Sequence, residues 1–134
     1  MTPGPEAFAE AARGMTGAPF RWLGRDPRTG LDCLGLVAAS LTAIGIAVPP
    51  LPRYAARIIA IDRLTALLPQ VGLAPATGPD RIGDVLLLQP GPAQYHLAIR
   101  ASPGTIVHAH AGLRRVTESP APAPWPIVAR WRLS

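Results

Sequence analysis

The sequence has a single cysteine, Cys33, among its 134 residues. Because a second thiol is absent, the chain cannot form an internal disulfide, and it has no Cys-x-x-Cys pair with which to hold a metal. Cys33 is therefore either an inert part of the core or a chemically active group. The residues around it decide between these two roles.

Aromatic residues make up only 5% of the sequence, and lysine is absent, since all 13 basic residues are arginines spread from Arg13 to Arg132. A nucleic-acid-binding surface needs clustered cations and stacking rings, so we expect no nucleic-acid partner. The formal net charge of +5 fits carboxylate-rich substrates. A codon bias of the genome would equally explain why every basic residue is an arginine.

Long uninterrupted apolar runs are also missing. The longest apolar stretch, Leu34 to Leu51, contains Ser40, Thr42 and the pair Pro49-Pro50, so it predicts a buried helix running into a loop and no membrane span. Residues 1–6 lack the basic and apolar regions of a secretory signal. We therefore expect a protein made in the cytoplasm.

Apolar residues nevertheless form 49% of the chain, enough for one packed domain over residues 1–134. Helical periodicity predicts helices over residues 6–15, from Asp32 or Cys33 to about residue 45, and over residues 54–68. Short runs rich in Val, Ile and Leu then predict strands over residues 84–89, 94–100, 105–110, 113–118 and 127–133. This order is typical of an α+β domain with N-terminal helices packed on a mostly antiparallel five- to six-stranded sheet.

The position of Cys33 favours the second role, that of a chemically active group. Gly24 and Gly30 break the chain before it and an apolar helix follows, so the thiol is placed near a helix N-terminus. Unpaired N–H groups and the helix dipole stabilise a thiolate at such a place. We expect a partly exposed thiol with a lowered pKa that reacts with iodoacetamide faster than a free thiol.

The three histidines, His96, His108 and His110, all fall in the strand half of the chain, where neighbouring strands can bring them together. Strand alternation separates His96 from its apolar neighbours, so His96 can face the helix that carries Cys33. Nucleophilic catalysis needs a base near the thiol and a third group to orient that base. Cys33, His96 and His108 can fill these positions, with His110 in reserve because it shares the strand face of His108.

A metal site built from Cys33, His108 and His110 is the alternative use of these residues. No second cysteine supports such a site, so we expect neither a metal nor a cofactor.

Five motifs resemble those of the NlpC-type (NlpC and p-sixty) cell-wall cysteine peptidases. Residues 20–26 (Phe-Arg-Trp-Leu-Gly-Arg-Asp) and 30–37 (Gly-Leu-Asp-Cys-Leu-Gly-Leu-Val) are similar to Tyr-x-Trp-Gly-Gly and Asp-Cys-Ser-Gly-Leu-Val. Residues 83–86, 96–99 and 107–109 resemble Gly-Asp-Leu-Val, His-Val-Gly-Ile and Ile-His-Ala. The motifs occur in the family's order, with 63 residues from Cys33 to His96 and 12 residues from His96 to His108.

The resemblance implies a minimal papain-like fold with a Cys-His-His triad made by Cys33, His96 and His108. It also implies a thioester intermediate and peptidoglycan stem peptides as substrates, cut at the γ-D-glutamyl to diamino acid bond. Backbone N–H groups at the start of the Cys33 helix would hold the oxyanion. The expected substrate-binding residues are Asp32, Arg25, Trp22 and Phe20.

Three residues depart from the family pattern: Phe20 replaces tyrosine, Leu23 replaces the second glycine and Leu34 replaces serine. The Gly-Arg-Asp and Asp-Cys-Leu-Gly variants are most similar to short proteins encoded in phage tail clusters and gene transfer agents. This similarity implies tail or baseplate proteins as partners, and a location in a particle tail that acts at the bacterial cell wall.

Two other functions stay open. Phe20, without a hydroxyl, fits a non-catalytic tail or baseplate component of the same fold. The apolar Leu23 and Leu34 would fit a thiol acyltransferase or amidase if they line the mouth of the cleft.

Overall fold

The computed structural model describes residues 3–51, 61–121 and 124–134. The described helices are α1 (Pro5–Gly14), α2 (Cys33–Ala43) and α3 (Ile61–Leu67), followed by the 3-10 turn η1 (Leu68–Val71). The strands are β1 (Arg25–Asp26), β2 (Gly30–Leu31), β3 (Leu73–Pro75), β4 (Val85–Gly91), β5 (Gln94–Ser102), β6 (Thr105–His110), β7 (Arg115–Pro120) and β8 (Ile127–Leu133).

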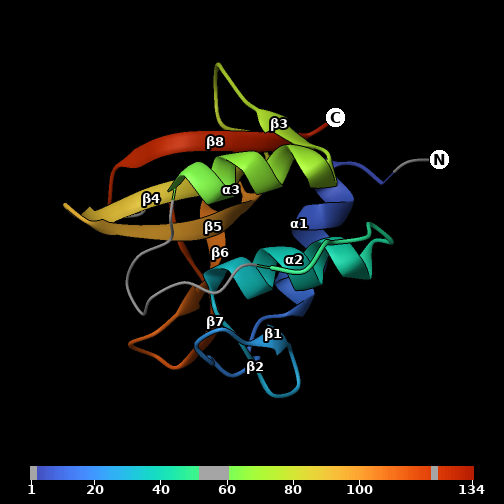
Figure 1. Ribbon diagram of the computed structural model, residues 1–134. Coiled ribbons are helices and arrows are strands. Elements are labelled where there is room, and N and C mark those ends of the chain that lie inside the picture. Colours follow the sequence, from blue (N-terminus) through green and yellow to red (C-terminus); the bar gives the residue numbers. More distant parts are fainter. Residues whose placement is uncertain (1–2, 52–60, 122–123) are drawn as a thin grey trace.

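Six strands form one sheet in the order β3-β8-β4-β5-β6-β7, and every pairing in it is antiparallel. Strands β1 and β2 form a separate antiparallel hairpin just before α2. Figure 1 shows the helices in front of the large sheet, with the small hairpin beyond its β7 edge. The α+β prediction is confirmed.

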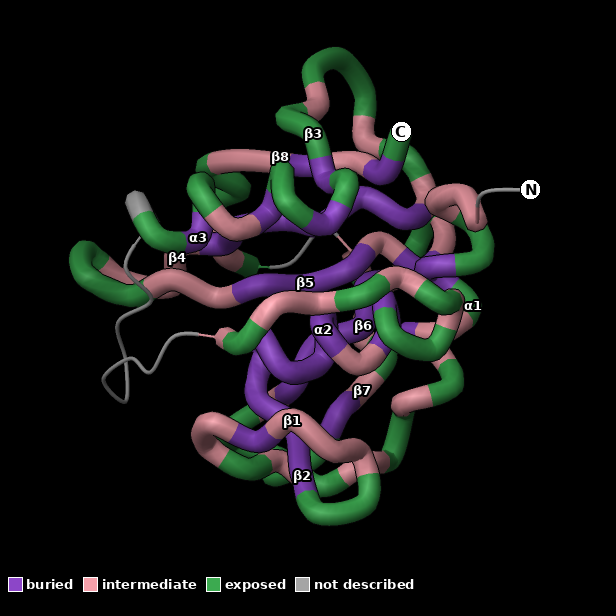
Figure 2. Tube along the Cα trace, turned by 45° about the vertical axis from the view of Figure 1, so that its right-hand side comes forward, coloured by how far each residue is buried: buried purple, intermediate pink, exposed green. Residues whose placement is uncertain are grey.

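Helix α2 is apolar on nearly all sides because it packs in the interior, between α1 and the strands β5 and β6. Eight of its eleven residues are buried. The buried hydroxyl of Ser40 is satisfied by a hydrogen bond that it donates to the Leu36 carbonyl at 2.7 Å. Figure 2 shows α2 and the middle of β5 as a continuous buried centre, with exposed residues at the turns.

Two hydrophobic clusters lie on opposite faces of the sheet. The larger contains Cys33, Leu97, Ile99 and residues of the helices. The smaller consists of Leu86, Leu88, Ala98 and Ile106, with Trp125 packed against it. Side chains therefore alternate along β5 between the two faces, as the sequence pattern predicts.

The expected elements are present with shifted ends. The second predicted helix and the strands 105–110 and 127–133 match α2, β6 and β8. Residues 54–60 of the third predicted helix lie outside the described residues, and the helix is seen from Ile61. The short strands β1, β2 and β3 were not predicted, because a strand of two or three residues is too short to show an alternation of apolar and polar side chains. Among the described helices, none has the length and hydropathy that a membrane span requires.

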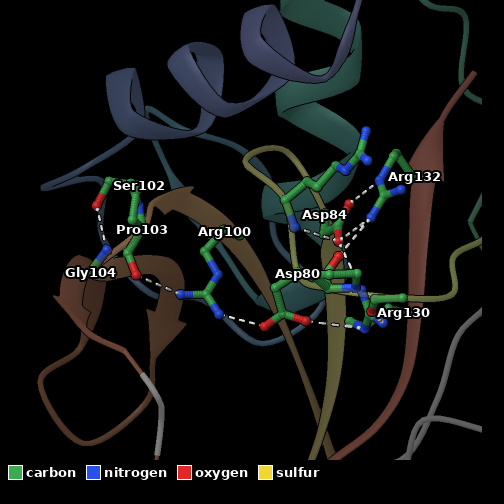
Figure 3. Close-up of polar contacts among 11 residues, drawn as sticks. Asp80, Asp84, Arg100, Ser102, Pro103, Gly104, Arg130 and Arg132 are labelled. Atoms are coloured by element: carbon green, nitrogen blue, oxygen red, sulfur yellow. Dashed lines mark hydrogen bonds and ion pairs between the residues drawn. The ribbon is translucent and has the colours of Figure 1, made fainter.

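A buried carboxylate joins the beginning of β4 to β8. Asp84 is fully buried and accepts hydrogen bonds from Arg132 Nε at 2.7 Å, from Arg130 Nη1 at 3.2 Å and from the Arg81 N–H at 3.0 Å. Asp80 lies between Arg130 and Arg100 and pairs with both (Figure 3). These contacts fix the relative positions of three neighbouring strands of the sheet.

The environment of Asp84 acts on its pKa in both directions. Burial raises it, but the hydrogen bonds and charges of Arg132, the Arg81 N–H and Arg130 outweigh burial and leave the pKa below its ordinary value of 3.8. Because the pKa is lower in the folded state, the ionised group stabilises the fold above about pH 4. This contribution is lost as the pH falls through the folded-state pKa.

We expect Asp84→Asn to lower the free energy of unfolding at pH 7 by about 2–4 kcal/mol, because it leaves partly buried arginines without their carboxylate. Urea unfolding at pH 7 and pH 3 measures the effect, and the difference between wild type and variant should shrink at pH 3. Asp26→Asn is the matched control, since Asp26 pairs with the exposed Arg28 and should cost under about 0.5 kcal/mol. Equal effects of the two substitutions would contradict the prediction.

Candidate active site

The position of Cys33 is set by the residue before it. Asp32 is the N-cap of α2, with an extended backbone, and its Oδ1 accepts the Gly35 N–H at 2.8 Å. The same carboxylate accepts the Leu23 N–H at 2.9 Å and binds Arg25 Nη1 at 2.8 Å. Asp32 is fully buried. It therefore fastens the preceding loop to the first turn of the helix that begins with Cys33.

Glycines permit the loop to approach this turn. A Cβ at Gly35 would lie 2.0 Å from the Gly24 carbonyl oxygen, and a Cβ at Gly24 would lie 2.1 Å from the Gly30 carbonyl oxygen. Neither position can carry a side chain without a backbone shift. Leu23 has a φ of 61°, which is unfavourable for a side chain with a Cβ, and its N–H bond to Asp32 helps to hold this conformation.

The two histidines meet where β5 and β6 part. Among the described residues, the backbone pairing of these strands ends at Ile99 and Val107, whereas β6 stays paired with β7 as far as His110. Beyond that point side chains bridge the strands: His96 Nε2 lies 2.9 Å from His108 Nδ1. His108 is 4% exposed.

Cys33 and this histidine pair line one cavity of about 320 Å³. His96 shares the face of Ala98, as strand alternation predicts, but α2 packs on the opposite face with Leu97 and Ile99, so the expectation that His96 faces this helix is wrong. Cys33 and His96 nevertheless line the same cavity, because the described strands β5 and β6 are not paired at His96. No hydrogen bond joins Cys33 to His96 in the part of the chain that the structure describes.

Trp125 covers the histidine pair. Its ring meets the rings of His96 and His108 edge-on, with centroid distances of 5.8 Å and 6.4 Å. This aromatic surface limits access of water to the bond between the imidazoles, which strengthens that bond by lowering the local dielectric constant. The sequence offered no signal for this role, because Trp125 lies in a proline-rich connection.

Burial controls the protonation of the site. It raises the pKa of the Cys33 thiol to about 12, helped by the Asp32 charge and opposed by backbone hydrogen bonds from Leu97 and the helix start. Burial also lowers the pKa of His96 to about 3 and that of His108 to about 4, with a further decrease from neighbouring histidines. The resting site therefore holds a neutral thiol and neutral imidazoles at pH 7.

The predicted lowered pKa and partial exposure of Cys33 are wrong. The thiol is 5% exposed, and loss of solvation outweighs the stabilisation of a thiolate by the helix N-terminus. The sequence placed the residue correctly at the helix start. It could not show how completely the sheet covers that start.

The expected substrate-binding residues lie in two places. Phe20 and Trp22 line the Cys33 cavity, and Trp22 also lines a neighbouring cavity of about 960 Å³ with Arg25. The guanidinium of Arg25 binds Asp32 and the Gly24 carbonyl, and Arg25 is not among the residues that line the Cys33 cavity. Asp32 itself is buried in this ion pair, so its observed contacts are structural, and substrate roles for Arg25 and Asp32 stay predictions.

Two further expected residues occupy positions unlike those assumed. Leu34 is buried in the core and Leu23 lines the larger cavity, so neither makes the mouth of the Cys33 cavity apolar. This removes the observation that favoured an acyltransferase or amidase. His110 lines the Cys33 cavity, and its Nδ1 accepts the Leu113 N–H at 3.0 Å.

Among the side chains that the structure describes, in residues 3–51, 63–121 and 124–134, no group of three or more His, Cys, Asp or Glu is arranged to hold a metal ion. Several of the described carboxylates pair with arginines instead, among them Asp32, Asp80 and Asp84.

A buried thiol at a helix N-terminus, with two hydrogen-bonded histidines on neighbouring strands, places this molecule among papain-like α+β proteins with a Cys-His-His site. The model of the NlpC/P60 family matches residues 17–126. The chain belongs to that family. A search of curated protein sequences finds no match.

Solved structures confirm the fold. The chain is similar to NlpC2 from Trichomonas vaginalis, with a TM-score of 0.67 and 17% identity over 95% of this chain and 47% of that one. It is similar to the P60 domain of antigen MAP1204 from M. avium subspecies paratuberculosis (TM-score 0.66, 20% identity, 96% and 93% coverage). It also resembles the peptidoglycan hydrolase RipB from Mycobacterium tuberculosis (TM-score 0.63, 23% identity, 96% and 63% coverage). The chain thus spans less than half of the Trichomonas protein.

We expect iodoacetamide to modify Cys33 at pH 7 roughly 100-fold or more slowly than a free thiol, because a raised pKa leaves little thiolate. The rate should rise steadily from pH 7 to pH 10 without a plateau. Mass spectrometry of the alkylated protein over time measures it, and the protein unfolded in urea, which should react like an ordinary thiol, is the control. A plateau reached below pH 7 would contradict the expected neutral thiol.

Proposed function

We propose that this protein is a cysteine peptidase that cleaves peptidoglycan stem peptides at the γ-D-glutamyl to diamino acid bond. The observation that carries the proposal is the cavity shared by Cys33 and the hydrogen-bonded pair His96–His108. Membership of the NlpC/P60 family supports it, and the similar protein RipB is described as a peptidoglycan hydrolase.

The hydrogen bond between the histidines supports the following roles in the reaction. His96 uses Nε2 to bond His108, which leaves Nδ1 as the nitrogen that can accept the Cys33 proton. As that proton moves, Sγ bonds to the peptide carbonyl carbon and the carbonyl electrons move to oxygen. The imidazolium of His96 then protonates the leaving amine, and the C–N bond breaks to give a thioester. Water attacks the thioester with His96 as base, which releases the carboxylate and restores the thiol.

Two backbone N–H groups at the start of α2 can stabilise the oxyanion of the tetrahedral intermediate. The N–H groups of Cys33 and Leu34 belong to the first turn of α2 and have no carbonyl partner within the helix. They can donate to the developing oxyanion next to Sγ. Phe20 lines the same cavity but lacks a hydroxyl. In this proposal the oxyanion is therefore stabilised by the backbone N–H groups.

A neutral thiol makes this a general-base reaction. With the thiol pKa at about 12 and that of His96 at about 3, a resting thiolate–imidazolium pair is unfavourable at pH 7. Proton transfer therefore accompanies the attack of Sγ on the carbonyl. A bound peptide supplies the electrophile that makes the transfer favourable.

The test is incubation of purified stem peptides with wild type, Cys33→Ala and His96→Ala, followed by mass spectrometry of the products. Wild type should cut at the γ-D-glutamyl bond, and either variant should lose at least about 1,000-fold in rate, because the nucleophile or its base is missing. Leu113→Ala is the control, since Leu113 is half exposed and should leave the rate unchanged. Thermal unfolding confirms that each variant is folded.

A second candidate is a non-catalytic component of the same fold. The observation that favours it is the burial of Cys33 with its raised pKa, since an inert core cysteine has these properties. A folded wild-type protein that cuts no stem peptide would support this candidate and overturn the peptidase.

We also propose that the protein acts from the tail of a phage or a gene transfer agent, at the bacterial cell wall. The sequence variants Gly24-Arg25-Asp26 and Asp32-Cys33-Leu34-Gly35 support this. The protein should then co-sediment with purified particles at a fixed ratio to a tail protein, measured by quantitative mass spectrometry. Recovery only in the particle-free supernatant would contradict it.

A further inference from the structure

The second ring nitrogen of His108 also has a partner. Its Nε2 lies 3.1 Å from Ser119 Oγ on β7, and Ser119 Oγ lies 3.2 Å from Thr117 Oγ1. Both serine and threonine are partly buried. A continuous line of hydrogen bonds therefore runs from the β7 hydroxyls through His108 to His96.

The register of the sheet makes this contact possible. Strand β6 pairs with β7 so that His108 lies opposite Thr117 and Ile106 lies opposite Ser119. Residues two apart on a strand share a face, so both hydroxyls project on the side of the histidine ring. The serine thus reaches Nε2 of His108 along a diagonal of the sheet.

The directions of these bonds follow from the proposed reaction, on which this inference rests. His96 can accept the Cys33 proton at Nδ1 only if its own proton is on Nε2, donated to His108 Nδ1. His108 must then carry its proton on Nε2 and donate it to Ser119 Oγ. The serine hydroxyl in turn donates to Thr117 Oγ1.

We infer that Ser119 is a positioning residue of the site: by accepting the Nε2–H of His108 it selects the tautomer that leaves His108 Nδ1 as an acceptor for His96. Ser119 is the acceptor that the described residues offer to this N–H, and a buried N–H left without an acceptor is costly. Without Ser119 the opposite tautomer of His108 is therefore favoured. In that state His108 donates to His96, and the His96 proton moves to Nδ1, facing the thiol.

The same contact acts during the reaction. When His96 takes the thiol proton, both of its ring nitrogens carry hydrogen, and Nε2–H must donate to an acceptor. His108 is neutral at neutral pH because burial lowers its pKa to about 4, so it provides a lone pair and no charge. Ser119 keeps that lone pair directed at His96.

The test combines spectroscopy with kinetics on the whole chain. Protein with ¹⁵N-labelled histidine gives the tautomer of His96 and His108 from imidazole ¹⁵N chemical shifts, which does not depend on activity. Wild type should show both rings protonated at Nε2. Ser119→Ala should shift both rings towards the Nδ1–H tautomer, and Ser119→Thr, which keeps a hydroxyl, should restore the wild-type pattern.

In cleavage of stem peptides, Ser119→Ala should lower kcat by about 10- to 100-fold, as typical of a partner that orients a reacting group through another residue. KM should change by less than about twofold, because Ser119 is not among the residues that line the Cys33 cavity. Ser119→Thr should recover most of kcat.

Ser102→Ala is the matched control. Ser102 Oγ also bonds a threonine hydroxyl, Thr105 Oγ1 at 2.6 Å, but has no histidine partner. It should change neither the ¹⁵N pattern nor kcat. Unchanged histidine tautomers in Ser119→Ala would overturn the inference, as would a kcat within twofold of an active wild type. If wild type cuts no peptide, the proposed function fails while the tautomer measurement still decides the role of Ser119.

Discussion

The buried carboxylate of Asp32 is the interaction on which the candidate site depends. It accepts the Gly35 N–H of helix α2, the Leu23 N–H of the preceding loop and the guanidinium of Arg25. A buried carboxylate is tolerated only when it is paired and hydrogen-bonded. These partners hold the loop and the helix start together, and Cys33 is the next residue along the chain.

A second buried carboxylate, Asp84, has a comparable role in the sheet. Its contacts to Arg130 and Arg132 join β4 to β8, while Asp80 connects Arg130 with Arg100 of β5. The C-terminal half of β5, the strand that carries His96, is thus fixed by the ion pair between Arg100 and Asp80. Around His96 the described backbone pairing of β5 with β6 has ended, and the cavity lined by Cys33, His96 and His108 lies there.

Enclosure of this cavity has opposite effects on chemistry. It disfavours charge, which keeps the thiol of Cys33 and the ring of His96 neutral at rest. It also strengthens the hydrogen bonds from His96 through His108 to Ser119, since these are screened less than in water. In the proposed reaction, catalysis would therefore depend on the orientation of neutral groups and not on a thiolate present at rest.

The sequence by itself determined the fold class, the helix start at Cys33 and the strands that carry His96 and His108, because these depend on local periodicity, glycine breaks and short motifs. Only the tertiary structure decided on which face of β5 the helix α2 packs, how far Cys33 is buried, and that Trp125 and Ser119 contact the histidines. These features depend on strand register, on the parting of β5 and β6, and on packing between segments far apart in the chain. Such contacts leave no periodic trace in the sequence, so residues outside the motifs were not identified from it.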